Sequence, residues 1–389
     1  MITLRGRSVE FNPAAMESGS PLLRLTTNRT RPAPLRAAEG FVHEGGDMPD
    51  GFGWYLLKAT EAMTLVPPGV PAAVLPAEFD HLADGDVVRL EPSRGGLRTL
   101  FRKAVPYNHF LLTERCNNYC LMCSQPPRTV EDGWIVDEIL EALPLMDRQA
   151  TEIGFTGGEP TLLGDRFIEL VRAAGSHLPT TALHILSNGR TFANGTLARD
   201  LGAIRHHDLM MGIPVYADLA HVHDHVVQAN GAFDETIRGI LALKAHGVRV
   251  EVRVVLQQQT IARLVPLARF LARNLLFIDH VALMGLELTG FARANLDQIW
   301  IDPIDYQAEL VEAVGILDRA GLKTSIYNSQ TCVLAPSIRR FARRSISDWK
   351  QDYMPECSGC LGRNECGGFF SSAKLRYSRA ISPITEQAT

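Results

Sequence analysis

The sequence predicts an α/β protein in which parallel strands alternate with helices around a closed or partly closed barrel. From Tyr107 onward, short apolar runs are mostly followed by longer stretches with helical spacing of apolar residues. The most unusual motifs lie on or directly after these runs, where parallel βα folds carry their reactive residues. Apolar residues make up 46% of the 389 positions and charged residues 21%, as in an ordinary globular chain with a large core.

Six strand-like runs and the helix-like stretches between them define this barrel. Each strand is short and apolar, and the following amphipathic stretch provides the right-handed crossover to the next parallel strand. The prediction is therefore a partial (β/α)6 barrel of the TIM type. The strand-like runs are 108–114, 152–157, 182–189, 209–216, 248–257 and 278–285, and the helix-like stretches are 135–146, 165–175, 233–247, 264–274 and 306–321.

The regions on either side of the barrel differ from it in composition. Residues 1–104 are rich in Pro, Gly and short alternating apolar runs, which predicts a small β-rich accessory domain. Because peptides can add a strand to an exposed sheet edge, peptide recognition is a hypothesis for this domain. We expect the barrel to span 105–322 and a small cysteine-bearing domain to span 323–389.

Charge and hydropathy exclude several classes of protein. The formal net charge of -4 gives no broad basic field, which argues against a nucleic-acid partner. The sequence has no run of about 18 uncharged apolar residues, so we expect neither a membrane span nor secretion. Seven cysteines in two clusters do not form the paired framework of a small secreted domain. We therefore expect a cytoplasmic protein whose cysteines bind metal.

Three of the cysteines, Cys116, Cys120 and Cys123, lie within "CNNYCLMC", directly after the first strand-like run. Thiolates are soft ligands that favour iron-sulfur clusters, zinc or copper(I). A structural zinc site is normally closed by four ligands, and no further Cys or His follows within fifty residues. Three ligands on a cubane cluster would leave one iron open to a small molecule. A zinc site remains the alternative.

Further motifs follow the later strands. "FTGGEP" ends the second strand-like run, "ILSNGR" the third, and "LMGLELTGFARAN" the sixth. "PVYADLAHVHDHV" follows the fourth run, and Arg253 lies within the fifth. Glycines at the second-strand turn permit a close approach of ligand to backbone. The three histidines at 221, 223 and 225 fit a polar loop better than a metal site.

The cysteine spacing and these turns resemble the radical S-adenosylmethionine (radical SAM) enzymes. The resemblance implies that Cys116, Cys120 and Cys123 hold a 4Fe-4S cluster and form the catalytic centre. The reduced cluster would cleave S-adenosylmethionine to a 5'-deoxyadenosyl radical that abstracts hydrogen from substrate. The implied cofactor contacts are Met122, Gly157, Gly158, Glu159, Pro160, Ser187, Asn188, Asp218, Arg253 and Leu286, with His223 and Asp224 as further candidates. Two departures from the family's pattern are Met122, where an aromatic residue is common, and Tyr216, where a serine is common.

Three of these contacts, Ser187, Asn188 and Arg253, have simpler alternatives. Ser187 and Asn188 could belong to an Asn-Gly turn that binds no ligand. Arg253 has a guanidinium suited to a carboxylate, which could come from the cofactor or from a structural ion pair.

The remaining cysteines, Cys332, Cys357, Cys360 and Cys366, lie near the C-terminus. Four thiolates can enclose one auxiliary 4Fe-4S cluster or one structural zinc ion. Their spacing resembles the SPASM or shorter twitch domains of peptide-modifying radical SAM enzymes, although a full SPASM domain would need about three more cysteines. We predict one auxiliary cluster, which could accept the electron left on a substrate radical and make the net reaction oxidative.

Taken together, residues 107–372 resemble the His-Xaa-Ser system radical SAM maturases. This resemblance implies a ribosomally made precursor peptide with His-Xaa-Ser repeats as substrate, a second radical SAM maturase as a possible partner, and a reductant such as flavodoxin or ferredoxin. The product would be an oxidised or cross-linked side chain. The alternatives are a radical SAM enzyme acting on another protein or a small molecule, as sulfatase-type maturases do, and a metal-cluster scaffold without radical chemistry.

Overall fold

A computed structural model describes residues 4–344 and 352–385. It divides into two compact units. The first unit contains the described residues up to Phe110 with Trp134–Ile153 and Arg172–Ala182. The second contains Leu111–Gly133, Gly154–Val171 and the described residues from Leu183 onward.

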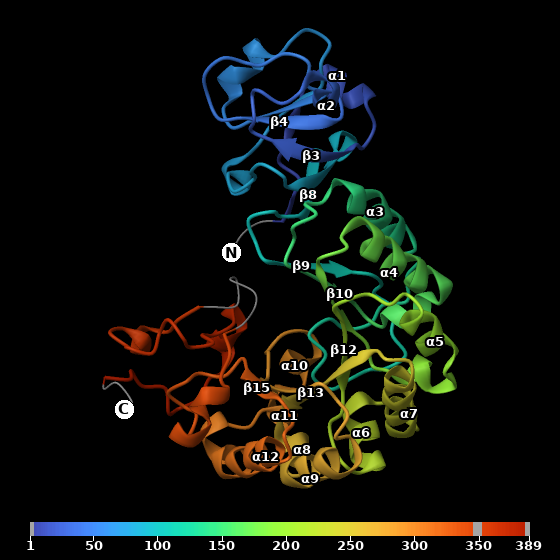
Figure 1. Cartoon of the computed structure of the whole chain (residues 1–389). Helices are drawn as coiled ribbons and strands as arrows, with labels where there is room; N and C mark the ends of the chain where they lie inside the picture. The colour runs from blue at the N-terminus through green and yellow to red at the C-terminus, as the bar shows by residue number, and fades with distance from the viewer. Residues whose placement is uncertain (1–3, 345–351, 386–389) are drawn as a thin grey trace. The chain divides into compact units, whose positions relative to one another are not determined.

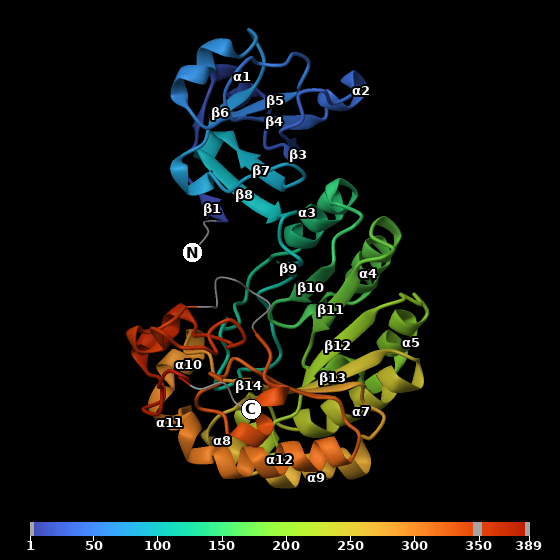
Figure 2. The ribbon, with the colours of Figure 1, turned by 60° about the vertical axis from the view of Figure 1, so that its left-hand side comes forward.

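The N-terminal region forms an eight-stranded mixed sheet with the order β1-β8-β7-β3-β4-β5-β6-β2 (Figure 2). Strands β3 to β6 pair in parallel, whereas β7, β8 and the two short edge strands pair antiparallel. The predicted β-rich N-terminal region is thus confirmed. Its strands are β1 (Arg5–Gly6), β2 (Glu10–Phe11), β3 (Leu22–Thr26), β4 (Glu39–His43), β5 (Trp54–Leu57), β6 (Ala72–Val74), β7 (Val87–Glu91) and β8 (Gly96–Phe101).

Both faces of this sheet are covered. On β5, Leu56 joins one apolar cluster, while its neighbours Tyr55 and Leu57 join a second cluster with Phe41. Successive side chains of a strand point to opposite faces, so the two clusters lie on the two sides of the sheet. The connections contain α1 (Pro13–Glu17), α2 (Ala33–Arg36) and the 3-10 turns η1 (Thr60–Leu65), η2 (Ala77–Phe79) and η3 (Pro92–Arg94).

The second sheet has seven strands in the order β15-β14-β13-β12-β11-β10-β9. Strands β11 to β15 pair in parallel, each with its sequence neighbour, which confirms the predicted α/β architecture. The seventh strand was not among the six predicted runs, because "TSIY" is only four residues long and half polar. The strands are β9 (Tyr107–Leu111), β10 (Glu152–Thr156), β11 (Ala182–Leu186), β12 (Leu209–Pro214), β13 (Arg249–Leu256), β14 (His280–Gly285) and β15 (Thr324–Tyr327).

The helices connect these strands, and α7, α9 and α12 lie together on the outer side of the sheet (Figures 1 and 2). Helix α9 shows why its sequence folds this way, because Leu264, Leu267, Ala268 and Leu271 are buried along one face at helical spacing. The helices are α3 (Trp134–Ala142), α4 (Asp165–His177), α5 (Thr196–Gly202), α6 (Ala220–Val227), α7 (Ala232–Ala245), α8 (Gln258–Ile261), α9 (Leu264–Asn274), α10 (Gly290–Ala294), α11 (Leu296–Ile299) and α12 (Gln307–Arg319).

Short 3-10 turns punctuate the rest of the chain. They are η4 (Leu143–Leu145), η5 (Pro160–Leu163), η6 (Arg190–Asn194), η7 (Pro303–Tyr306), η8 (Pro336–Phe341), η10 (Pro355–Cys357) and η11 (Ser371–Leu375). The C-terminal segment contacts Asp302, the residue directly before η7. The Asp302 carboxylate accepts hydrogen bonds from the Ser378 hydroxyl and the Arg379 backbone N–H.

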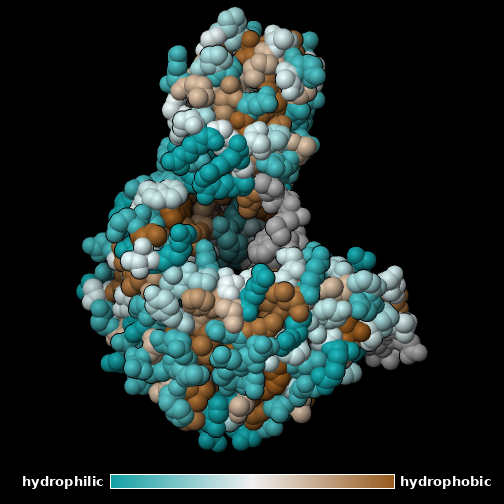
Figure 3. Space-filling model, turned by 180° about the vertical axis from the view of Figure 1, so that it is seen from behind, coloured by the Kyte–Doolittle hydropathy of each residue, from teal (hydrophilic) through white to brown (hydrophobic). Residues whose placement is uncertain are grey.

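The surface seen in Figure 3 is mostly hydrophilic, with apolar side chains scattered between polar ones. In the parts of the chain that the structure describes, none of the helices is both long and apolar enough to span a bilayer.

Candidate active site

The three clustered cysteines lie in the loop that follows β9. Burial, with smaller contributions from the nearby Glu159 and Cys123, raises the pKa of the Cys116 thiol to about 11. The pKa of Cys120 is raised well above its usual range, by burial and then by Cys123 and Cys116. Cys123 thus raises the pKa of both Cys116 and Cys120, so the three thiols lie near one another. A bound cationic centre would reverse this effect, so the trio fits a cluster held by thiolates.

The middle of this loop is held by the C-terminal end of α6. The backbone N–H of Tyr119 donates to the Val227 carbonyl at 3.0 Å, and that of Leu121 donates to the Val226 carbonyl at 2.9 Å. The residues on either side of Cys120 thus have a defined backbone path. Additionally, the Asn118 N–H donates to the Cys116 sulfur at 3.4 Å, a contact typical of cluster ligands.

The far end of the loop contacts α10, which follows the sixth barrel strand. The Phe291 N–H donates to the Cys123 carbonyl at 2.8 Å, and the Asn295 amide donates to the Leu121 carbonyl at 2.8 Å. A Cβ on Gly290 would lie 2.5 Å from the Cys123 carbonyl oxygen, and this glycine has φ +54°. The chain therefore needs glycine at 290 for this approach.

The "GGEP" turn after β10 packs on the backbone just before the first cysteine. The Gly158 N–H donates to the Thr113 carbonyl at 2.7 Å, and the Glu159 N–H donates to the Arg115 carbonyl at 2.8 Å. A Cβ on Gly158 would lie only 2.1 Å from the Arg115 oxygen. Only glycine allows this contact, and Pro160 then begins η5.

Glu159 is fully buried and lies at the centre of a polar network. Its Oε1 accepts from the Thr161 N–H at 3.0 Å, the Thr161 hydroxyl at 2.6 Å and the Ser187 hydroxyl at 2.8 Å. Its Oε2 accepts from the Asn188 N–H at 2.6 Å. Burial raises the pKa of Glu159, while the four donors oppose that rise. The carboxylate thus joins the turns after β10 and β11.

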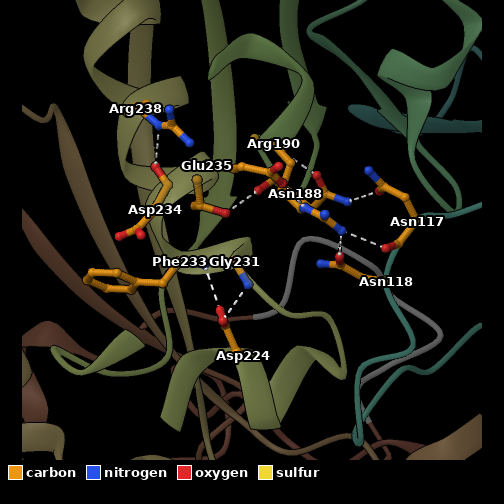
Figure 4. A network of polar contacts seen from close by, with 12 residues as sticks. Asn117, Asn118, Asn188, Arg190, Asp224, Gly231, Phe233, Asp234, Glu235 and Arg238 are labelled. Carbon is orange, nitrogen blue, oxygen red and sulfur yellow. Dashed lines mark hydrogen bonds and ion pairs between the residues drawn. The ribbon is translucent and has the colours of Figure 1, made fainter. Parts of the chain in front are cut away.

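The turn after β11 is in turn joined to the cysteine loop (Figure 4). The Asn188 amide donates to the Asn117 side-chain oxygen at 2.6 Å. Arg190 donates through Nη1 to the Asn117 carbonyl and to Asn118 Oδ1, both at 2.7 Å, and through Nε to Glu235 Oε2 at 2.6 Å. Sequence reasoning missed Asn117, Asn118, Arg190 and Glu235, because only the folded chain brings them together.

Several predicted cofactor contacts meet in one apolar cluster. Met122 and Tyr216 are buried there, and the half-buried Cys120, Val255 and Leu286 pack against them. Burial raises the pKa of Tyr216 well above its usual value, and Cys120 raises it further. Met122 and Leu286, predicted from separate motifs, therefore lie in one apolar environment beside Cys120.

The candidates after the fourth barrel strand have partners within the protein. Asp218 accepts hydrogen bonds from Nε and Nη2 of Arg263, at 2.8 and 2.5 Å. Asp224, which lies in α6, accepts hydrogen bonds at the start of α7 from the Gly231 and Phe233 N–H groups, at 2.6 and 2.8 Å. This gives Asp224 a capping role.

His223 is also engaged inside the protein. Its Nδ1 accepts from the Tyr216 N–H at 3.2 Å, and burial lowers the His223 pKa to about 4. Within residues 4–344 and 352–385, no group of three or more His, Cys, Asp or Glu side chains is arranged to hold a single metal ion.

Arg253 lies in a polar network that crosses β13 to β15. It donates to Glu251 Oε1 at 3.0 Å and contacts the Met284 sulfur at 3.0 Å. Glu251 Oε2 lies 2.6 Å from His280 Nδ1, and His280 Nε2 lies 2.9 Å from the Ser325 hydroxyl. Burial alone would raise the pKa of Glu251, but hydrogen bonds from His184 and His280 and the charge of Arg253 hold that pKa far below its usual range. Arg253 thus forms a structural ion pair with Glu251, which is the alternative named for it above.

The four C-terminal cysteines line one hollow, together with Thr331 and Tyr353. The Gly368 N–H donates to the Cys366 sulfur at 3.5 Å and the Ile384 N–H to the Cys360 sulfur at 3.3 Å. Among the described residues, the buried Thr331 hydroxyl has no hydrogen-bond partner. Converging sulfurs, N–H donors directed at them and an unsatisfied hydroxyl fit a bound cluster in this hollow. The four cysteines are Cys332, Cys357, Cys360 and Cys366.

All seven cysteines lie in the described residues, and each is a free thiol there. Their assignment to two clusters stays a prediction.

Comparison with known proteins finds a family model that matches part of the barrel. Residues 110–271 match the model of the Radical SAM superfamily. No curated protein is significantly similar to this chain. Among solved structures, native anSMEcpe with bound AdoMet and Cp18Cys peptide is 14% identical, with a TM-score of 0.50, and the match covers 71% of this chain and 92% of that one. This likeness concerns the fold.

Two further solved structures are similar with lower TM-scores. SuiB from Streptococcus suis is 16% identical with a TM-score of 0.45, over 59% of this chain. The match spans about half, 50%, of the SuiB chain. A radical SAM methyltransferase from Sphaerobacter thermophilus is 17% identical with a TM-score of 0.45, covering 68% of this chain and 75% of that one.

Proposed function

We propose, from the premise that this chain is a radical SAM enzyme, that it oxidatively modifies or cross-links side chains of a ribosomally made peptide. The observation that carries the proposal is the continuous contact between the three-cysteine loop, the "GGEP" turn and the turn after β11. These are the segments expected to surround a cluster and its cofactor.

Within this site, Cys116, Cys120 and Cys123 would hold a 4Fe-4S cluster through thiolates. When bound, the cluster supplies one-electron reduction of S-adenosylmethionine and hence radical chemistry. The "GGEP" backbone and the neighbouring Ser187 and Asn188 would bind the methionine part of the cofactor. Met122 and Leu286 offer apolar surface to its base, since both pack in one cluster.

Two further contacts would complete the cofactor site. Arg253 would bind the cofactor carboxylate, and Glu251 would keep its guanidinium oriented. Asp218 would bind the ribose while it also accepts hydrogen bonds from Arg263. A carboxylate has about four acceptor positions, so it can accept from both groups at once.

The four C-terminal cysteines support an oxidative reaction. A cluster in their hollow could take the electron left after hydrogen abstraction, whereas a zinc ion could not. We therefore assign Cys332, Cys357, Cys360 and Cys366 to one auxiliary 4Fe-4S cluster in a twitch-like domain, predicted to span 323–389, of which 345–351 and 386–389 lie outside the described residues. Zinc is the alternative that metal analysis tests.

The finer assignment is to the HxsC component of the His-Xaa-Ser system, and it rests on the sequence resemblance. The substrate would then be a precursor peptide with His-Xaa-Ser repeats, and a second radical SAM maturase would be a partner. A cytoplasmic enzyme reduced by flavodoxin or ferredoxin fits the free cysteines. The β-rich N-terminal region would recognise the peptide.

The test is anaerobic reconstitution with iron and sulfide, followed by incubation with S-adenosylmethionine, dithionite and the repeat peptide. We expect 5'-deoxyadenosine and a peptide lighter by two hydrogen atoms. Formation of 5'-deoxyadenosine with an unchanged peptide would favour a different protein or small-molecule substrate. A cluster-loaded protein that never forms 5'-deoxyadenosine would favour the scaffold alternative.

A further inference from the structure

A cavity of about 580 Å³, part of it open to solvent, lies at the carboxyl ends of β13, β14 and β15. Its walls include Leu256 and Gly285, which end β13 and β14, and Asn328, which directly follows β15. Because β11 to β15 pair in parallel, these ends share one edge of the sheet with the turn after β11. That turn holds Ser187 and Asn188, which are assigned above to the cofactor. This strand-end cavity therefore lies at the edge where parallel sheets bind their ligands.

The strand-end cavity borders both of the centres proposed above. Leu286 lines the cavity and also packs against the apolar cluster that contains Met122. Gln330 lines both the cavity and the hollow of the four C-terminal cysteines. A group bound in the cavity would thus lie next to the surface assigned to the cofactor's base and next to the auxiliary site. The proposed oxidative reaction needs its substrate at such a place, because it uses the radical from one centre and the electron acceptor at the other.

Aromatic side chains line the strand-end cavity, and several are held in place by their neighbours. The Arg376 guanidinium lies over the Trp300 ring, 5.2 Å from its centroid, and donates to the Asp297 carboxylate at 3.0 Å. The Tyr377 ring meets the Phe369 ring edge-on, with centroids 5.9 Å apart. Such walls bind flat rings well, since stacked and edge-to-face contacts add to the burial of apolar surface. The aromatic residues of the wall are Trp300, Tyr306, Phe369, Phe370 and Tyr377.

The wall also contains a hydroxyl that has no partner inside the described chain. Ser372 lines the cavity, and among the residues that the structure describes its buried Oγ makes no hydrogen bond. Other polar side chains of the wall do have partners, since Ser378 donates to the Asp302 carboxylate and Gln330 donates to the Gly368 carbonyl at 2.8 Å. Buried hydroxyls are normally satisfied, so this one indicates a polar group on the molecule that the cavity binds.

We propose that the strand-end cavity binds a ring-bearing side chain of the substrate peptide, and that this ring carries a nitrogen or oxygen at its edge. The aromatic walls would contact the ring, and the Ser372 hydroxyl would hydrogen-bond the polar atom on its edge. The imidazole of histidine and the phenol of tyrosine share this chemistry, whereas phenylalanine lacks the polar atom and leucine lacks the ring. The inference rests on the proposed function, since it requires a peptide substrate.

The test is a binding cycle with the cluster-loaded, unreduced protein and short fluorescent repeat peptides. The peptides carry His, Tyr, Phe or Leu at the histidine position of the repeat, and fluorescence anisotropy measures each Kd with S-adenosylmethionine present. We expect wild type to bind the tighter of the His and Tyr peptides about 3- to 10-fold more tightly than the Phe peptide, through one neutral hydrogen bond. The Phe peptide should in turn bind about 3- to 10-fold more tightly than the Leu peptide, which lacks the ring contacts.

The variant Ser372→Ala removes only the proposed hydrogen-bond partner. It should bind the His, Tyr and Phe peptides equally within about twofold, while it keeps the preference for Phe over Leu. Ser371→Ala is the matched control, because Ser371 is the exposed neighbour in η11 and undergoes the same chemical change. It should keep all the wild-type preferences. Ser372→Ala should also melt at no lower temperature than wild type, because the deleted hydroxyl has no hydrogen bond to lose within the described residues.

Each outcome of the cycle supports or overturns the inference. A tighter His peptide assigns the cavity to an imidazole, and a tighter Tyr peptide assigns it to a phenol. If Ser372→Ala keeps the preference for polar rings, or if the Leu peptide binds wild type as tightly as the Phe peptide, the inference is wrong. Oxidation of the His-Xaa-Ser peptide by wild type would then leave the proposed function standing. Failure of wild type to bind any of the four peptides would overturn the inference together with the proposed substrate.

Discussion

The Oε2 atom of Glu159 accepts a hydrogen bond of 2.6 Å from the backbone N–H of Asn188. This contact joins the turn after β10 to the turn after β11. The side-chain amide of Asn188 also donates to Asn117, which lies in the cysteine loop. Three segments that are distant in sequence are thus held by one buried carboxylate.

Replacing Glu159 by Gln should destabilise the protein strongly. The amide puts an N–H₂ group where one carboxylate oxygen accepts, so at least one buried donor loses its acceptor. We expect the free energy of unfolding to fall by about 2 to 3 kcal/mol. Urea unfolding of the metal-free protein measures this. Glu169→Gln, at an exposed helix position, is the control and should change stability by less than about 0.5 kcal/mol.

Arg190 should determine how firmly the first cluster is retained. Arg190→Met removes the contacts to Asn117, Asn118 and Glu235, so the segment between Cys116 and Cys120 loses its support. We expect iron to be lost to a chelator about tenfold faster, since a charge-assisted hydrogen bond is worth about 1.5 to 3 kcal/mol. Absorbance of the reconstituted cluster follows the loss.

The control for Arg190 is Arg238→Met. Arg238 also lies near this network in Figure 4, but within the described residues it donates only to the Asp234 carbonyl on its own helix, at 3.2 Å. Arg190→Lys should lie between wild type and Arg190→Met, because a lysine keeps the charge facing Glu235 without the fork of donors. Equal iron loss in all the variants would contradict a positioning role for Arg190.

The two groups of cysteines should hold separate metal centres. We expect about eight irons per reconstituted chain, and about four after either Cys120→Ala or Cys360→Ala. Only Cys120→Ala should abolish cleavage of S-adenosylmethionine, whereas Cys360→Ala should keep cleavage and lose peptide oxidation. Metal analysis that finds about one zinc and four irons per wild-type chain would instead assign zinc to the C-terminal hollow.

Stability should depend on pH through His223. Burial depresses the His223 pKa from 6.5 to about 4, so the folded state favours the neutral imidazole. The stabilisation is complete above about pH 6.5 and is lost as the pH falls towards 4, by about 3 kcal/mol in all. His223→Asn keeps an acceptor for the Tyr216 N–H without titrating. The metal-free variant should therefore show a smaller acid-induced loss than wild type in urea unfolding at each pH.

Local patterns were sufficient for much of the fold and for the outline of the site. The strands carrying "FTGGEP" and "ILSNGR" were identifiable because their apolar runs end at glycine turns. Helix α9 was identifiable because its apolar residues recur at helical spacing. These signals lie within about fifteen neighbouring residues and need no tertiary information.

Other features could not be read from the sequence because tertiary contacts create them. Arg190 is one of many arginines until folding brings it to the Asn117 carbonyl. The pairing of Asp218 with Arg263 joins residues 45 positions apart.

The close backbone contacts of Gly158 and Gly290 limit how this enzyme can be diversified. A library randomised at either position should return almost only glycine among variants that still carry the first cluster, because any side chain would push the neighbouring carbonyl away from its place. Gly133, which has open space around its Cβ position, should accept many residues in the same selection. Directed evolution towards new peptides is therefore best aimed away from these two glycines.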